Sequence, residues 1–225
     1  MRFLLLILLL TLGTAHQSLG AAGAVHQVFA AKPLRMQNII FFGNSLTAGY
    51  QLRASEAFPS LIQQRIDSLQ LPYKALNYGV SGETTAGGRQ RLTSVLARQP
   101  VDVFVLELGA NDGLRGIPVR ETTQNLQYIL DQVRLKYPKA RIVLVGLEFP
   151  FDLSILGGHQ YGHYAAEFKA LFRSLAEKNN VAFVPFLLQG VIGIRELNLP
   201  DGVHPNAQGQ KILANNVWAV LQTVI

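Results

Sequence analysis

The sequence predicts a single α/β domain, in which a parallel sheet of five strands is covered by helices on both sides. Short apolar stretches typical of buried strands alternate along the chain with stretches of helical periodicity. Hydrophobic residues make up 49% of the chain and charged residues 15%, against about 25% charged in an average soluble protein. A length of 225 residues fits one domain, and no internal repeat or low-complexity linker divides it.

Each predicted strand is a short apolar run that ends at turn-forming residues. The clearest is VDVFVLEL, which is rich in β-branched residues and lies between Pro100 and Gly109. Continuous apolar runs of this kind are typical of strands buried on both faces. The predicted strands are residues 38–43, 73–78, 101–108, 141–147 and 181–184.

The stretches between and after these strands have the spacing of amphipathic helices. Phe58, Leu61, Ile62 and Ile66 share one helical face in the first of them. The predicted helices are residues 57–71, 85–98, 122–137, 164–178 and 207–224. Strands that are separated by helices join through crossovers into a parallel sheet.

The N-terminus has the features of a secretory signal. A positive Met1-Arg2 start precedes an apolar run over residues 3–12, which is far shorter than the roughly 20 residues that span a bilayer. We expect a signal peptide over residues 1–24, a single folded domain over residues 36–225, and export to the periplasm or the medium. Retention of the leader as an uncleaved anchor is the alternative.

Composition excludes several other classes of protein. The absence of cysteine excludes a disulfide scaffold, a thiolate zinc site and a cysteine nucleophile. Lys and Arg number 20 against 14 acidic residues, a formal charge of +6, but the basic residues are scattered along the chain. We therefore expect no nucleic-acid partner.

Four polar, glycine-rich segments follow predicted strands. They read GNSLTAGY at residues 43–50, NYGVSGET at 77–84, GANDG at 109–113 and DGVHPN at 201–206. Ligands of open parallel sheets bind beyond the carboxyl ends of the strands, so these segments are expected to gather at one edge of the sheet.

The residue types in these segments suit nucleophilic acyl transfer. Ser45 is a poor nucleophile without a base, and His204 is the candidate base because its ordinary pKa lies near neutrality. Asp201 lies three residues earlier and can orient the imidazole. Asn111 can supply a side-chain N–H to the oxyanion of the tetrahedral intermediate, while Ser45 and Gly82 can supply backbone N–H groups.

Each of these features also has a simpler structural explanation. Ser45 can cap a helix, and the segments at Asn111 and Asp201 can be ordinary turns. His159 and His163 have a metal-ligand spacing, but no third ligand or H-E-x-x-H pattern accompanies them. The chain also has no dinucleotide loop, P-loop or G-x-S-x-G elbow, so we expect no cofactor and no metal.

Taken together, the four segments resemble the consensus blocks of the GDSL, or SGNH, hydrolase family. ELGANDGLRG at residues 107–116 is similar to its bacterial periplasmic thioesterase, protease and lysophospholipase branch. The resemblance implies a three-layer α/β/α, flavodoxin-like fold with strand order 2-1-3-4-5 and a metal-independent mechanism. By motif matching it implies catalytic Ser45, Asp201 and His204, and an oxyanion hole formed by Ser45, Gly82 and Asn111.

One residue departs from the family pattern. Asn44 stands where the family usually has an acidic residue. Asn keeps the size and the acceptor oxygen of Asp and adds an N–H donor, so a hydrogen-bonding role can survive. Because Asp201 already orients the base, the proposed triad does not need a carboxylate at position 44.

Apolar residues near the predicted site point to a hydrophobic acyl group in the substrate. Residues expected to line a groove are Phe149, Phe151, Leu153 and Ile155 on one side, and Leu114 and Ile117 on the other. Residues 186–199 form a second candidate lid. The alternative is that these side chains are ordinary core beneath a long loop.

The function predicted from these observations is that of an exported serine esterase, a carboxylic ester hydrolase. Its substrates are aryl or acyl esters, thioesters or lysophospholipids, and the chain is expected to be a monomer with at most transient contact with a membrane surface. The alternatives are a carbohydrate O-deacetylase and a non-catalytic binding protein of the same fold. A sugar cleft usually carries aromatic platforms, whereas Trp218, the only tryptophan, lies in the last predicted helix and is expected to face the core.

Overall fold

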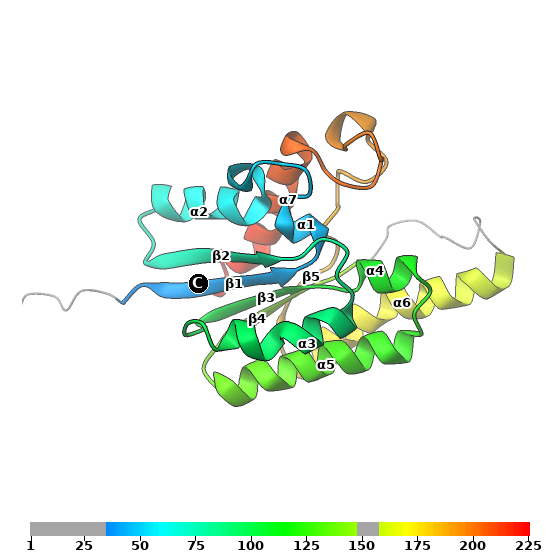
Figure 1. Cartoon of the computed structure of the whole chain (residues 1–225), viewed down its shortest axis with the longest axis horizontal. Helices are drawn as coiled ribbons and strands as arrows, with labels where there is room; N and C mark the ends of the chain where they lie inside the picture. The colour runs from blue at the N-terminus through cyan, green and yellow to red at the C-terminus, as the bar shows by residue number, and fades with distance from the viewer. Residues whose placement is uncertain (1–34, 148–157) are drawn as a thin grey trace, which may run out of the picture. The chain divides into compact units, whose positions relative to one another are not determined.

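The computed structural model describes residues 35–147 and 158–225, and these ranges contain a parallel five-stranded sheet of order β2-β1-β3-β4-β5 (Figure 1). The fold class and the strand order predicted from the sequence are confirmed. The strands are β1 (Gln37–Gly43), β2 (Tyr73–Gly79), β3 (Val103–Glu107), β4 (Arg141–Val145) and β5 (Ala182–Val184).

Helices cover both faces of the sheet, with α2 and α7 on one face and α3, α5 and α6 on the other (Figure 1). These five were predicted, with ends that differ by a few residues. The helices α1 and α4 and the 3-10 turns η1 and η3 were not, because three to five residues are too few to show a helical period. The bounds are α1 (Ser45–Ala48), η1 (Ala54–Glu56), α2 (Phe58–Ser68), α3 (Thr85–Leu96), α4 (Ala110–Leu114), α5 (Val119–Lys136), α6 (Gly158–Asn179), η3 (Arg195–Leu197) and α7 (Ala207–Leu221).

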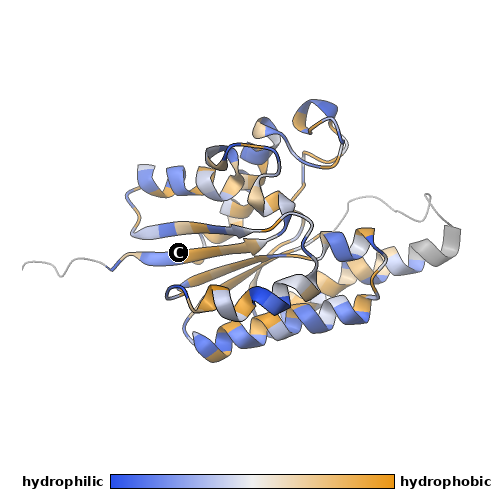
Figure 2. Ribbon diagram, in the orientation of Figure 1, coloured by the Kyte–Doolittle hydropathy of each residue, from blue (hydrophilic) through white to orange (hydrophobic). Residues whose placement is uncertain are grey.

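The central strands are apolar on both sides because each side faces a separate core. In β1, Ile39 and Phe41 pack into the core beneath α2 and α7, while Ile40 and Phe42 pack into the core beneath α3, α5 and α6. All four side chains are fully buried. Figure 2 shows the same layering, with the central strands coloured as hydrophobic between helices whose outer faces are polar.

The strand register brings the loops of the predicted site together. Gly43, the last residue of β1, is level with Gly79 at the end of β2 and with Glu107 at the end of β3. The three polar segments that follow these strands therefore start from the same edge of the sheet. A side chain at Gly79 would place its Cβ 2.2 Å from the backbone nitrogen of Ala48, so glycine lets α1 pack directly on the end of β2.

Asn44, not Ser45, caps the short helix α1. The Asn44 Oδ1 accepts a hydrogen bond of 2.8 Å from the backbone N–H of Leu46. Ser45 is the first residue of the helix, so its hydroxyl is not used as the cap. The alternative reading of Ser45 as a helix cap is therefore wrong.

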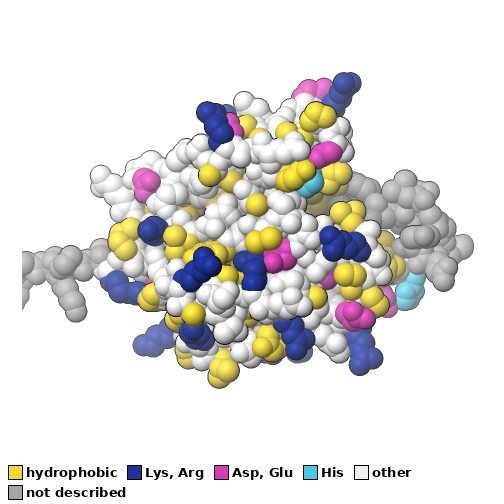
Figure 3. Space-filling model, viewed as in Figure 1, with side chains coloured by type: hydrophobic (Ala, Val, Ile, Leu, Met, Phe, Trp, Pro, Cys, Tyr) yellow, Lys and Arg dark blue, Asp and Glu magenta, His cyan; other side chains and the backbone are white. Residues whose placement is uncertain are grey.

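Within the described ranges, none of the helices has the length and apolarity needed to cross a membrane. The predicted signal peptide lies outside these ranges. Lys and Arg side chains are spread over the face shown in Figure 3 and do not gather in one patch.

Candidate active site

Ser45 and His204 meet at the carboxyl edge of the sheet. Ser45 starts α1 directly after β1, and His204 lies in the loop between η3 and α7. The Nε2 of His204 lies 2.9 Å from the Oγ of Ser45, although the two residues are 159 positions apart in the sequence. A hydroxyl at this distance can pass its proton to the imidazole.

The other ring nitrogen of His204 is held by Asp201. Its Nδ1 lies 2.8 Å from Asp201 Oδ2, while Asp201 Oδ1 accepts hydrogen bonds of 2.9 Å from the backbone N–H groups of His204 and Val203. These two N–H groups lower the pKa of Asp201 to about 2, that of His204 having the larger effect. Asp201 is therefore ionised at neutral pH and holds the proton of the imidazole on Nδ1, which leaves Nε2 free to accept.

The loop that carries His204 is fixed by contacts on two sides. The carbonyl of His204 accepts a 2.7 Å hydrogen bond from the backbone N–H of Leu199, and Asn198 forms a β-bridge with Pro205. The ring of Tyr50 packs against the imidazole at a centroid distance of 4.4 Å. The side chain of His204 remains 23% exposed, so a substrate can reach it.

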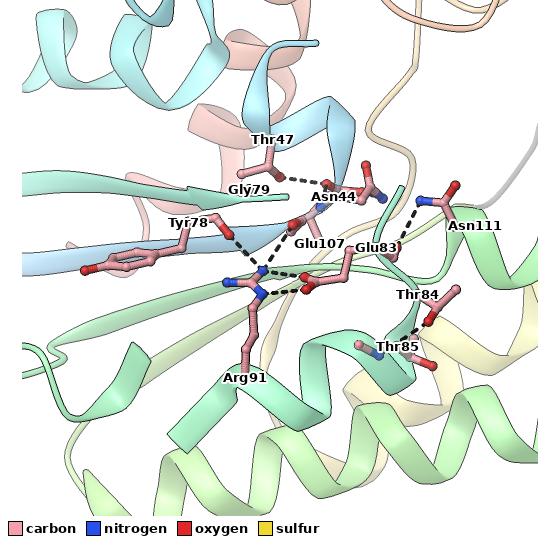
Figure 4. A network of polar contacts seen from close by, with 12 residues as sticks. Asn44, Thr47, Tyr78, Gly79, Glu83, Thr84, Thr85, Arg91, Glu107 and Asn111 are labelled. Atoms are coloured by element: carbon pink, nitrogen blue, oxygen red, sulfur yellow. Dashed lines mark hydrogen bonds and ion pairs between the residues drawn. The ribbon is translucent and has the colours of Figure 1, made fainter. Parts of the chain in front are cut away.

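The other two predicted oxyanion donors, Gly82 and Asn111, lie after the ends of β2 and β3. Gly82 has a φ of +78°, a conformation that favours glycine, in the loop between β2 and α3. Asn111 lies in α4, and its Nδ2 donates a 2.9 Å hydrogen bond to the carbonyl of Glu83 (Figure 4). A side-chain amide nitrogen has two hydrogens, so the bond to Glu83 uses one N–H of Asn111 and does not use the other.

A partly buried ion pair ties the Gly82 loop to the sheet. Arg91 of α3 is paired with the carboxylate of Glu83 and donates to the carbonyl of Tyr78 at 2.8 Å (Figure 4). The guanidinium also lies 3.9 Å from the centre of the Phe42 ring. These contacts fix the loop relative to the strand that leads to Ser45.

An apolar cavity of about 640 Å³ opens beside Ser45 and His204. Its polar lining includes Ser45, Asn111 and His204, together with Asn44 and Asn198. Largely apolar side chains from five different parts of the chain form much of the rest, namely Leu114, Leu147, Tyr164, Ala165, Phe168, Leu188, Ile192 and Val203. A small number of polar groups at one end of an apolar cavity is typical of a site for a largely hydrophobic ligand.

The sequence anticipated only part of this lining. Leu114 lines the cavity and is 76% exposed. Ile117 is not among the described lining residues, and its carbonyl accepts a 2.7 Å hydrogen bond from the hydroxyl of Tyr164 instead. Phe149, Phe151, Leu153 and Ile155 lie outside the described residues. The second candidate lid, residues 186–199, contributes Leu188, Ile192 and Asn198.

Tyr164 and Phe168 were missed because their helical spacing reads as ordinary core. They stack on each other at a centroid distance of 5.7 Å, and both face the cavity. In the described part of the chain no group of three or more His, Asp or Glu side chains could hold a metal ion. The Nδ1 of His163 lies 3.8 Å from the Oε1 of Glu167.

Glu107 is a second group that sequence reasoning passed over, although an acidic residue inside an apolar strand is a visible signal. It is 2% exposed and accepts hydrogen bonds from Asn44 and Thr47. Burial raises the pKa of Glu107 to about 7, although the hydrogen bonds from Thr47 and Asn44 act in the opposite direction.

This pKa predicts a pH dependence of stability. An unfolded Glu107 titrates near 4.5 and the folded one near 7, so the folded state binds the proton more tightly. The contribution to stability is complete below pH 4.5 and is lost as pH rises through 7, by about 3 kcal/mol at most. Denaturant unfolding across this range should show a steeper loss for the wild type than for Glu107→Gln. If the free energies of unfolding of the two proteins changed equally with pH, the raised pKa of Glu107 would be contradicted.

A hydroxyl, an imidazole and a carboxylate joined in this order define the class of serine hydrolases. Residues 41–212 match the GDSL-like Lipase/Acylhydrolase family, and the chain belongs to that family. It is therefore an enzyme that hydrolyses ester bonds.

Two relatives illustrate the similarity. The esterase TesA of Pseudomonas aeruginosa is 31% identical over 205 residues, which cover 91% of this chain and 97% of that protein. The thioesterase 1/protease 1/lysophospholipase L1 of Escherichia coli K12 is 32% identical over 188 residues, 83% of this chain and 84% of that protein.

The fold of the chain is also similar to solved structures of esterases. A crystal structure of TesA matches with a TM-score of 0.76 and 32% identity, over 84% of this chain and 100% of the other. The esterase EstA from Pseudoalteromonas, in a structure described as inhibited by monoethylphosphonate, matches with a TM-score of 0.74 and 27% identity, over 83% of this chain and 97% of the other.

Proposed function

We propose that the chain is an exported serine esterase that hydrolyses carboxylic esters, thioesters or lysophospholipids with hydrophobic acyl groups. The observation that carries the proposal is the chain of hydrogen bonds from Ser45 through His204 to Asp201, at the mouth of an apolar cavity. Export is supported by the signal-like composition of residues 1–24.

In the acylation step, the Oγ of Ser45 attacks the carbonyl carbon of the ester while the Nε2 of His204 takes the hydroxyl proton. The carbonyl oxygen becomes an oxyanion, which accepts hydrogen bonds from the Ser45 and Gly82 backbone N–H groups and from the Asn111 side chain. His204 then gives its proton to the leaving alcohol or thiol as the C–O or C–S bond breaks. Asp201 stays ionised throughout and stabilises the imidazolium.

In the deacylation step, water replaces the alcohol. His204 takes a proton from the water, whose oxygen attacks the acyl carbon and forms a second tetrahedral intermediate. When this collapses, the imidazolium returns the proton to the Oγ of Ser45 and the fatty acid leaves. The same three residues and the same hydrogen bonds therefore act in both half-reactions.

The apolar lining favours esters of hydrophobic acids. Phe168 and Leu147 are buried side chains that line the cavity, and Leu114 is an exposed one. Transfer of each methylene group of an acyl chain from water into such a cavity is favourable by about 0.8 kcal/mol. The name of the Escherichia coli relative, which includes thioesterase and lysophospholipase, supports the same substrate classes.

Covalent labelling tests the proposed nucleophile. We expect a fluorophosphonate to label the wild-type enzyme at Ser45 and to abolish hydrolysis of p-nitrophenyl butyrate in proportion to the label. Peptide mapping by mass spectrometry locates the modified residue. Labelling at another serine, or complete labelling without loss of turnover, would refute the assignment of Ser45.

Filling the cavity should shorten the preferred acyl chain. Ala165 lines the cavity, so Ala165→Trp is expected to lower kcat/KM for p-nitrophenyl decanoate by about tenfold or more and to change that for the butyrate less. Ala166 is exposed, lies next to it on α6 and is absent from the described lining, so Ala166→Trp is the matched control. Equal effects of the two substitutions would place the acyl group elsewhere.

A further inference from the structure

The carboxyl group of Glu107 lies behind Ser45 and is not part of the hydrogen-bond chain to His204. Glu107 is the last residue of β3 and is paired in register with Gly43, two positions before Ser45. A side chain at Gly43 would place its Cβ 2.6 Å from Glu107 Oε2, so the carboxyl packs directly against the backbone there. A carboxyl buried this deeply in a strand end needs a reason beyond packing, because burial of the charged form is unfavourable.

The contacts of this carboxyl go to the turn that presents Ser45 (Figure 4). Its Oε1 accepts a 2.7 Å hydrogen bond from Asn44 Nδ2. Its Oε2 accepts one of 2.6 Å from the hydroxyl of Thr47 and one of 3.2 Å from the backbone N–H of Asn44. The two residues that donate lie on either side of Ser45, so the carboxyl holds the turn before and after it.

The orientation of the Asn44 amide is set by a different contact. Its Oδ1 accepts from the backbone N–H of Leu46 at 2.8 Å, which leaves Nδ2 as the edge that faces Glu107. Glu107 is therefore met by donors at both oxygens, and it can accept every one of them when it is ionised, above its pKa of about 7. A carboxylate at position 44 would instead place two acceptors 2.7 Å apart, and one of the pair would have to hold a proton.

No cation of the described residues pairs with Glu107. On α3, Arg91 is paired with Glu83 and reaches the carbonyl of Gly43 at 3.4 Å. On the far side of Ser45, His204 is bound to Asp201. The neutral donors of Asn44 and Thr47 thus carry the interaction with the buried carboxyl.

We propose that Glu107 is a positioning residue for Ser45, and that position 44 carries an amide because its N–H must meet this carboxylate. The inference rests on the proposed role of Ser45 as the nucleophile. The turn fixes the positions of two groups of Ser45. One is the Oγ, which faces His204, and the other is the backbone N–H that is proposed to donate to the oxyanion. A displacement of either by a fraction of an ångström reduces the rate, because the reacting atoms must be aligned.

Exchanging the two functional groups tests the proposal. Glu107→Gln sets an N–H donor of the new amide against a donor of Asn44 or of the turn, and Asn44→Asp sets two carboxyls together. The double variant Asn44→Asp/Glu107→Gln restores an amide–carboxylate pair with the roles reversed: the new carboxylate accepts from Leu46 and from the new amide, whose oxygen still accepts from the turn. Every donor again has an acceptor.

We expect each single variant to lower kcat for p-nitrophenyl butyrate by about tenfold or more with little change in KM, and the double variant to recover most of that loss. Recovery supports positioning through this pair, because two unrelated structural lesions would add. The proposal is overturned if the folded double variant is as impaired as the product of the two single effects, or if folded Glu107→Gln keeps the wild-type kcat.

Controls separate this inference from the proposed function. Glu56→Gln makes the same change at a surface carboxylate that is paired with Arg53, and it should leave kcat unchanged. Circular dichroism and thermal unfolding establish that each variant is folded. If Glu107→Gln does not fold, Thr47→Val removes one donor to the carboxyl and should lower kcat several-fold; an unchanged kcat would overturn the proposal. Failure of the fluorophosphonate to label wild-type Ser45 would instead refute the proposed function and the inference with it.

Discussion

Replacing Ser45 by alanine is expected to lower kcat/KM by at least about 10⁴-fold, because the covalent route is lost and only binding and the oxyanion donors remain. His204→Ala should have an effect of similar size, since the Oγ of Ser45 then has no base within 2.9 Å. The double variant should be little worse than either single variant, because the two residues act as one unit. Steady-state turnover of p-nitrophenyl butyrate measures all three.

Structural damage is a competing explanation for such losses and is easily checked. Ser45 is nearly buried but contributes a small side chain, so Ser45→Ala leaves no large cavity and should unfold within a few degrees of the wild type. Substantial residual turnover in folded Ser45→Ala, unaffected by a fluorophosphonate, would mean that another nucleophile performs the reaction.

Replacing Asn111 by alanine is expected to lower kcat by about 10²–10³-fold with a smaller change in KM. The reason is that the second N–H of Nδ2 is proposed to stabilise charge on the substrate oxygen that develops only in the transition state. Burst kinetics with a p-nitrophenyl ester should show a slower burst, because acylation is slowed, and a slower steady-state phase, because the oxyanion of deacylation loses the same donor.

The substitution of Asn111 also removes the 2.9 Å hydrogen bond to the carbonyl of Glu83, so a control for the loop is needed. Arg115 donates a 3.0 Å hydrogen bond to the carbonyl of Gly82 in the same loop, and it is exposed. Arg115→Gln removes that contact without removing an oxyanion donor and should change kcat only a few-fold. Equal losses in the two variants would show that Asn111 acts on the loop and not on the oxyanion.

Some features follow from short stretches of sequence because local chemistry decides them. The apolar run at β1 is typical of a strand buried between two cores, and the polar, glycine-rich segment after it indicates where that strand ends. Asp201 and His204 lie three residues apart, so a single turn of the backbone brings their side chains within hydrogen-bond distance. The same reasoning left Ser45 open as an alternative helix cap, since Asn44 and Ser45 are both good caps and only the contact with Leu46 distinguishes them.

The sequence by itself determined the strands and the main helices of this protein, the edge at which the polar loops gather, and the residue types that suit acyl transfer. Only the tertiary structure decided which side chains line the cavity and which donors surround Glu107. Tyr164, Phe168 and Leu188 reach the site through packing of α6 and a distant loop, and the turn at Asn44 meets Glu107 through the register of β1 and β3. Contacts of this kind depend on how whole elements pack against one another. The residue pattern of one segment does not indicate which other segment it will contact.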